Sequence, residues 1–245
     1  MLIVGLGQAG CNIATLFKQH DQYQVELLDE GKGIKKYATA EDYDSINYKP
    51  RKKGLKSASE GILFVCGSGK VAGATLRVLE GLKHVRMTVV YICPDLEYAS
   101  RNEKLRHRAH FNILQQYTRS GLIEEMMLMD NKILLDIAGH GTVHKYYEKV
   151  NFFVYSTIHT LNYCANVKPE FSSIHSPKKI SRITTIGFGD LEESEEKMLF
   201  LLDNITETSY IISINEEELA NDVDLLPNIK AMAGENKKLD RETSF

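Results

Sequence analysis

An apolar stretch that ends in a glycine turn and leads into a helix-like segment occurs twice in the first half of the chain. LIVGLG is followed by CNIATLFKQH, and GILFVCGSG is followed by VAGATLRVLEGLK. Three further apolar stretches, YQVELLD, MTVVYICPD and MMLMDN, end in polar residues and are predicted strands. Strands that alternate with helices predict a parallel sheet covered on both faces, with ligands at the carboxyl ends of the strands. We therefore expect the chemistry in the loops GLGQAGCN, DEGKG, GSGKVAG, CPDLE and DN.

The second half of the chain predicts one long helix and a smaller unit. Residues 144–168 are predicted as a central helix, although β-branched and aromatic residues leave a strand open for part of it. RITTIGFGD and SYIISIN are predicted strands on either side of a helix over EESEEKMLFLLDNI. We therefore divide the chain into a nucleotide-binding domain (1–143), the central helix (144–168), a reduced α+β second domain (169–230) and a loose charged tail (231–245).

Composition excludes several classes of protein. The formal net charge is −3, so we expect no general field for nucleic acid and see no clear nucleic-acid site. The four cysteines are well separated and form no CxxC pair, which is typical of a reduced, intracellular protein. We expect no signal peptide, because the first apolar stretch is only about a strand long and lacks a basic leader. No apolar run approaches the ~20 residues of a membrane span, so we expect a soluble, cytoplasmic protein. His107 and His110 lack neighbouring cysteines or acids, so no metal site is predicted.

The first glycine turn is compatible with two kinds of nucleotide. Gly5, Gly7 and Gly10 form a G-x-G-x-x-G pattern after a strand, and the following helix would point its free N–H groups at a phosphate. Asp29 lies about 20 residues further on, where an acid binds the ribose in NAD sites. This motif alone favours NAD and another nucleotide equally.

The second glycine turn favours a nucleoside triphosphate. GSGKVAG also follows an apolar strand and opens a helix, but it does not match the P-loop pattern. A Rossmann enzyme does not need a second phosphate-binding loop at this position. A nucleoside triphosphate carries more negative charge and can use phosphate-binding loops from two neighbouring strands. An ordinary strand-to-helix turn is the alternative explanation of this loop.

These loops together resemble those of the tubulin and FtsZ superfamily. GLGQAGCN is similar to the family's first nucleotide loop, and GSGKVAGAT stands where the family has its glycine-rich signature loop. MDNKIL is similar to the family stretch that ends in Asp-Asn, and RITTIGFGDLEESEEKM resembles the start of the second domain. The resemblance implies an α/β fold in which a Rossmann-like parallel sheet forms a GTP-binding domain.

The resemblance also implies roles for individual residues around GTP or GDP, with Mg²⁺ left open as a further cofactor. It assigns phosphate, sugar or base contacts to the first loop, ribose contacts to Asp29 and Asp95, phosphate contacts to the second glycine loop, and base contacts to three later residues. These residues are Gly7, Gln8, Ala9 and Asn12 in the first loop; Gly67, Ser68, Gly69, Lys70 and Gly73 in the second; and Asn131, Tyr147 and Asn151 at the base.

Two departures from the family pattern bear on hydrolysis. Val71 replaces a glycine of the signature loop, and Lys70 replaces a threonine. Lys70 would either add a positive charge beside the phosphates or be a solvated lysine on a turn, and the sequence favours the two equally. After Pro169, the positions of the family's catalytic acids are filled by Ser173, His175 and Lys178. A lysine is neither a carboxylate base nor a metal ligand, so hydrolysis by the usual inter-subunit mechanism is not expected.

The sequence therefore predicts a guanine-nucleotide-binding protein of the cytoskeletal type. It would self-associate as a homo-oligomer or filament and could engage an adaptor protein. No catalytic residue is assigned, and a weak GTPase activity is left open. A non-polymerising interaction module and an NAD-dependent Rossmann oxidoreductase are the alternatives.

Overall fold

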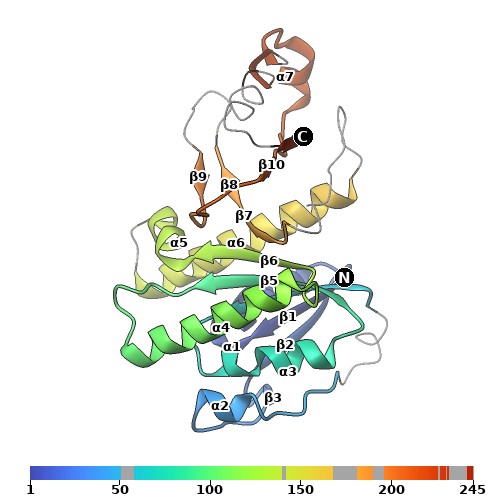
Figure 1. The fold of residues 1–245 in the computed structure, drawn as a ribbon. Coiled ribbons are helices and arrows are strands. Elements are labelled where there is room, and N and C mark those ends of the chain that lie inside the picture. The colour runs from blue at the N-terminus through green and yellow to red at the C-terminus, as the bar shows by residue number, and fades with distance from the viewer. Residues whose placement is uncertain are drawn as a thin grey trace.

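A seven-stranded, entirely parallel sheet forms the centre of the computed structural model, in the order β3-β2-β1-β4-β5-β6-β7 (Figure 1). The structure describes residues 1–50, 58–139, 142–167, 181–189, 196–225, 227–229, 231 and 242–244. The strands are β1 Leu2–Leu6, β2 Gln24–Glu30, β3 Gly33–Ile34, β4 Glu60–Cys66, β5 Arg86–Cys93, β6 Glu125–Asp130 and β7 Ile183–Thr185. The α/β, Rossmann-like architecture expected from the strand and helix alternation is confirmed.

Helices cover both faces of the sheet. They are α1 Gly7–Leu16, η1 Phe17–Gln19, α2 Ala40–Tyr43, η3 Val71–Ala74, α3 Thr75–Gly81, α4 Arg101–Arg119, α5 Asn131–Ala138 and α6 Val143–Asn166. One core cluster joins the sheet to α3 and α4, and the other joins it to α1, α5 and α6. The long helix expected near residues 144–168 is α6, with no strand inside it.

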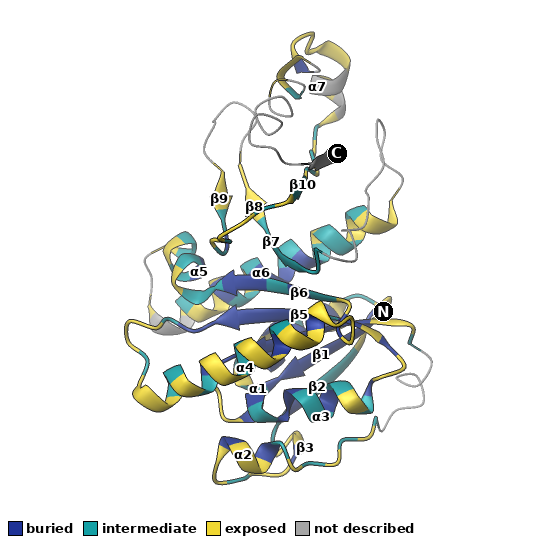
Figure 2. Cartoon of the chain, viewed as in Figure 1, coloured by how far each residue is buried: buried dark blue, intermediate teal, exposed yellow. Residues whose placement is uncertain are grey.

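Burial explains why the strands are nearly continuous apolar runs. The residues of β1 are all buried, and β4 and β5 are buried along most of their length (Figure 2). A parallel sheet with helices on both faces has no solvent face, so its strands need not alternate between apolar and polar residues.

Two glycines of the first turn permit the close packing of α1 on the sheet. A Cβ on Gly10 would lie 2.3 Å from the carbonyl oxygen of Phe64 in β4. A Cβ on Gly5 would lie 2.4 Å from the carbonyl oxygen of Gly10. Neither backbone could move away without separating α1 from β1 and β4, so both positions require glycine.

The chain after α6 departs from the predicted elements. The single strand predicted over 182–190 is two: β7 joins the main sheet beside β6, and β8 Gly187–Phe188 pairs with β9 Lys197–Met198. The strand predicted over SYIISIN is wrong beyond its first residue, because β10 covers Glu207–Ser209 and residues 210–215 form no regular element. Residues 242–244, predicted within the loose tail, form β11 Glu242–Ser244 against β10.

The helix predicted over 192–205 is also wrong in the part that the structure describes, 196–205. Leu199 is fully buried there; its N–H donates to the carbonyl of Ile186 at 2.8 Å, and its carbonyl accepts from Asp130 at 2.6 Å. These bonds hold the chain beyond the end of β6, where a helix would use the same groups internally. A short helix, α7 Glu216–Asn221, follows, and Figure 1 shows it well away from the main sheet.

Within the described residues, no helix combines the length and apolar character that crossing a membrane requires.

Candidate functional site

The carboxyl edge of the main sheet brings together the loops predicted to carry the chemistry. Because β1 lies between β2 and β4, the first turn lies beside both the end of β2 and the second glycine loop. The ends of β5 and β6 continue the same edge on the far side of β4. Because these strands are parallel, all five loops lie at the same edge of the sheet. The strand order reverses between β1 and β4, which is where open α/β sheets bind ligands.

The first turn leads directly into α1. Gly7 has a φ of 73°, and the nearest atom to a Cβ there would be Cβ of Val71, at 3.7 Å. Gln8 and Asn12 are exposed and Ala9 is half-buried. No side chain caps the start of α1, so the N–H groups of its first turn are available to an anion.

The three glycines of the second loop have different surroundings. A Cβ on Gly67 would lie 1.8 Å from Oη of Tyr91, and a Cβ on Gly73 would lie 2.1 Å from the carbonyl oxygen of Ala40. At Gly69 the nearest atom would be the Cys66 carbonyl oxygen, 3.9 Å away. Gly67 and Gly73 thus allow close packing against Tyr91 and Ala40, whereas Gly69 has open space where a side chain would be. The helix that follows, η3, also has no side-chain cap.

The side chain of Lys70 bridges two loops. Its ammonium donates to the carbonyl of Ala38 at 3.2 Å, ahead of α2. Its charge also lowers the pKa of Glu30, although less than other neighbours do. The lysine predicted to add positive charge therefore lies between the second loop and the end of β2.

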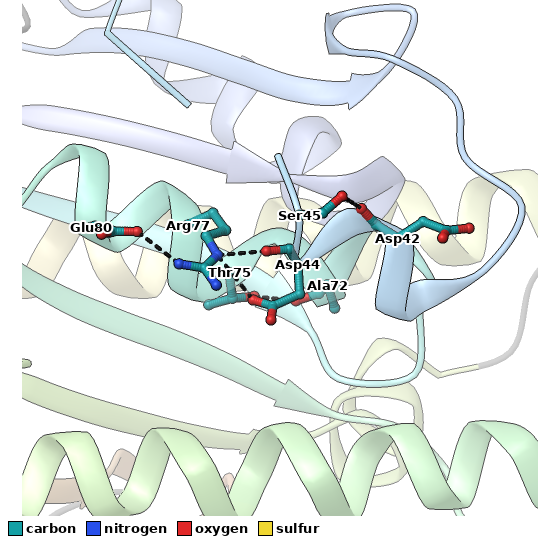
Figure 3. A network of polar contacts seen from close by, with 7 residues as sticks. All are labelled: Asp42, Asp44, Ser45, Ala72, Thr75, Arg77 and Glu80. Atoms are coloured by element: carbon teal, nitrogen blue, oxygen red, sulfur yellow. Dashed lines mark hydrogen bonds and ion pairs between the residues drawn. The ribbon is translucent and has the colours of Figure 1, made fainter. Parts of the chain in front are cut away.

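A polar network fixes α2 beside the second loop (Figure 3). Arg77 of α3 pairs with Asp44, at 3.3 Å, and with Glu80, at 3.0 Å. Its Nε also donates to the carbonyl of Asp44 at 2.5 Å, just beyond the end of α2. Because Gly73 permits contact with Ala40, the two segments are joined both by backbone packing and by charge.

The two acids at the end of β2 are already engaged. Oδ1 of Asp29 accepts from the backbone N–H of Glu30 at 2.9 Å. Glu30 accepts from the hydroxyl of buried Tyr43 at 2.5 Å and pairs with Lys36 at 3.6 Å. The Tyr43 hydrogen bond is the main cause that lowers the pKa of Glu30. Asp29 is half-buried at the edge of the site.

The loops after β5 and β6 are connected to each other. Asp95 accepts from the N–H of Glu97 at 2.9 Å, and Lys132 donates to Glu97 at 3.0 Å. Asp130 caps α5 by accepting from the N–H of Lys132 at 2.8 Å. Asn131 is half-buried, and within the described chain its side-chain amide has no hydrogen-bond partner.

The start of α6 supplies the remaining predicted base contacts. Tyr147 is 54% exposed, and its ring meets that of Tyr146 edge-on with centroids 6.1 Å apart. Asn151 is half-buried. α6 packs against both α1 and α5. Phe17, at the end of α1, contacts Tyr155 with ring centroids 4.9 Å apart. Further along both segments, Asn162 of α6 donates to the hydroxyl of Tyr23, just before β2, at 2.8 Å. α1 and α6 therefore run in the same direction, so their starts lie at the same end of the sheet.

Sequence reasoning missed the side chains that α4 contributes behind the second loop. Nε of Arg106 donates to the carbonyl of Ser68 at 2.9 Å, and Nδ1 of His110 lies 3.2 Å from the carbonyl of Gly67. Burial lowers the pKa of His110, which keeps the imidazole neutral at neutral pH. The available signal was their spacing of four residues on a predicted helix, which places both on one face.

Two expectations concern metals and catalysis. Among the described residues, no three histidine, cysteine, aspartate or glutamate side chains gather as a metal site. Ser173, His175 and Lys178, predicted to replace the catalytic acids, lie outside the described residues.

Comparison with solved structures identifies the fold. A GTPγS-form protofilament structure of TubZ from Bacillus thuringiensis serovar israelensis matches with a TM-score of 0.68 and 15% identity, over 100% of this chain and 81% of that one. Its GDP-form protofilaments match with a TM-score of 0.66 and 14% identity, over 99% and 82%. FtsZ from M. jannaschii matches with a TM-score of 0.56 and 13% identity, over 76% and 62%. No family model and no curated protein matches the sequence. The chain therefore has the same fold as TubZ and FtsZ, at 13–15% sequence identity.

Proposed function

We propose that the chain binds GTP and GDP at the carboxyl edge of its sheet. The observation that carries the proposal is the pair of uncapped helix starts at neighbouring strands. α1 and η3 follow the two glycine turns without a side-chain cap. α2, α4 and α5 are capped by Thr39, Ser100 and Asp130, whereas α6, and α3 that continues η3, are uncapped but follow no glycine turn of the sheet. Uncapped N–H groups beside glycines are typical of anion sites.

The phosphates would be bound mainly by backbone. The N–H groups of Gly7, Gln8 and Ala9 open α1, and Gly69 leaves space for an oxygen atom beside the second loop. Lys70 adds a positive charge nearby. This division spreads the charge of a triphosphate over two cradles, which a diphosphate cofactor of a Rossmann enzyme would not need.

Guanine and ribose would lie along the helices on the other side of the first turn. Asn131 and Asn151 offer amides able to pair with the donors and acceptors of the base edge, and Tyr147 offers an exposed ring for stacking. Asn12 lies on α1, which packs against α6. Asp29, at the end of β2, and Asp95, after β5, would contact the ribose. These are proposed contacts, supported by their common edge and by the similarity in fold to TubZ.

Mg²⁺ would depend on the nucleotide for its ligands. The described residues provide no ready-made group of three ligands, and Glu30 is occupied by Tyr43 and Lys36. Mg²⁺ is commonly bound through phosphates, waters and one or two carboxylates. Phosphate oxygens with the half-buried Asp29 fit that pattern.

Self-association is the second part of the proposal. It is supported by the likeness to TubZ structures that contain protofilaments. The chain would act as a nucleotide-dependent, cytoskeletal-type scaffold in the cytoplasm, with an adaptor protein as a further partner. No catalytic residue is proposed, and hydrolysis is not required for binding or assembly.

Calorimetry with GTP, GDP, ATP and NAD in parallel, with and without Mg²⁺, tests the proposal. Selective binding of guanine nucleotides is expected, and binding of NAD alone would support the oxidoreductase instead. Sedimentation with each nucleotide then tests assembly: pelleting that depends on GTP is expected. Pelleting in none of the conditions would favour a non-polymerising interaction module.

A further inference from the structure

The second glycine loop is held from behind by α4, through its carbonyl groups. Arg106 donates to the carbonyl of Ser68 at 2.9 Å, and His110 donates to the carbonyl of Gly67 at 3.2 Å. Both side chains are half-buried and one helical turn apart, so they reach the loop from a single face of α4. A carbonyl only accepts, so Nδ1 of His110 carries the hydrogen.

Because the peptide group is planar, these two contacts also determine where the N–H groups of Ser68 and Gly69 point. In a planar trans peptide, the C=O of one residue and the N–H of the next point in opposite directions. With the Gly67 and Ser68 carbonyls turned toward α4, the N–H groups of Ser68 and Gly69 point away from α4. The Ser68 N–H has no hydrogen-bond partner in the described part of the chain.

A buried tyrosine sets the position of the loop from beneath. Tyr91 of β5 is fully buried, and its hydroxyl lies 3.0 Å from Nδ1 of His107 on α4. The same hydroxyl would be 1.8 Å from a Cβ on Gly67, so the loop backbone rests directly on it. Gly67 also donates its N–H to the carbonyl of Ile92 at 3.2 Å. The loop backbone is therefore contacted by Tyr91 of β5 as well as by Arg106 and His110 of α4.

We propose that Arg106 and His110 are positioning residues that hold the second glycine loop with its N–H groups turned toward the phosphates of the bound nucleotide. This inference rests on the proposed nucleotide binding and adds to it the residues that orient the second glycine loop. A loop with more glycines would reach many orientations, whereas here Lys70 and Val71 follow Gly69 and α4 supplies the restraint. Anion binding by backbone requires such prior ordering, because ordering the loop on binding would weaken affinity.

The test compares variants within α4. Arg106→Gln and His110→Leu each remove one donor, and we expect each to weaken GTP binding about tenfold, the effect of losing one oriented hydrogen bond. Arg108→Gln removes the same charge from an exposed position two residues away and is the matched control, with an expected change below about twofold. His110→Asn places an amide donor near the former Nδ1 position and should restore most of the affinity.

A second measurement separates positioning from general destabilisation. Backbone amide NMR of the protein without nucleotide should show the Ser68 and Gly69 signals shifted in Arg106→Gln but not in Arg108→Gln, at similar melting temperatures. Equal GTP affinity in Arg106→Gln, His110→Leu and Arg108→Gln would overturn the inference while leaving the proposed function intact. Absence of nucleotide binding by the unmodified protein would overturn the proposed function and the inference together.

Discussion

The imidazole rings of His20 and His159 stack with centroids 4.2 Å apart and planes 19° from parallel. His20 follows η1 at the end of α1, and His159 lies on α6. Nε2 of His20 lies 2.6 Å from the hydroxyl of Tyr155, and Nδ1 of His159 lies 2.8 Å from the hydroxyl of Tyr23. This cluster joins α1 to the central helix at the end of the sheet opposite the proposed nucleotide site.

The histidine pair predicts that stability falls in mild acid. Burial lowers the pKa of His159 from its usual 6.5, and His20 lowers it further. The unfolded chain therefore binds a proton at higher pH than the folded chain. The stabilisation from His159 is present above about pH 6.5 and is lost as the pH falls through the lower folded-state pKa.

The measurement is the melting temperature of the unmodified protein and of His159→Gln across about pH 5 to 8. The unmodified protein should lose more on acidification, by on the order of 1–3 °C. His107 and His110 also have lowered pKa values but titrate in both proteins, so the difference isolates His159. Parallel curves would contradict the prediction.

Glycine substitutions separate packing from binding. Gly10→Ala should destabilise the fold by about 2 kcal/mol or more, because its Cβ would lie 2.3 Å from a backbone oxygen in β4. Gly69→Ala should leave the melting temperature nearly unchanged, because the atom nearest to its Cβ would be the Cys66 carbonyl oxygen, 3.9 Å away. The same substitution should weaken GTP binding about tenfold. Urea unfolding and calorimetry measure the two effects. Full GTP affinity in Gly69→Ala would remove this residue from the site.

Asn131→Asp tests recognition of the base. The substitution keeps the shape of the side chain but replaces an amide donor with a carboxylate, which would repel an acceptor on the guanine edge. We expect GTP affinity to fall at least about tenfold, with unchanged stability, because Asn131 has no side-chain partner to lose in the described chain. Asp136→Asn, at an exposed position on the same helix, is the control. Unchanged affinity in Asn131→Asp would refute the base-reading role.

Thiol reactivity should follow burial. Burial, with a smaller effect of Asp29, raises the pKa of Cys11 to about 11, and burial also raises the pKa of Cys93. Since the thiolate is the reactive form, both should resist alkylation at neutral pH. Cys66 and Cys164 are only half-buried and should both react before Cys11 and Cys93. Iodoacetamide labelling followed by peptide mass spectrometry checks this order, and early labelling of Cys11 would show that α1 opens from β1.

The order of strands and helices around the site could be predicted from the sequence by itself. The apolar runs of β1, β4 and β5 are short and end in turn residues, which favours strands, and the apolar spacing in α4 extends over enough residues to favour a helix. The turns after these strands are marked by glycine or proline, which act on the backbone of the same few residues. Local patterns also predicted the helix α6, although its β-branched and aromatic residues left a strand open for part of it.

Tertiary structure decided what local patterns leave open. Asp130 and Ile186 use the backbone groups of Leu199, so the helical pattern around it does not form a helix. His110 bonds to a carbonyl 43 residues away, and Gly67 is a glycine because Tyr91 lies beneath it. Such contacts depend on how β4, β5 and α4 pack together. The pattern of apolar residues within one segment does not show where another segment lies. The sequence by itself determined which loops meet at the carboxyl edge of the sheet; only packing decided which of their groups face a neighbour and which face the proposed nucleotide.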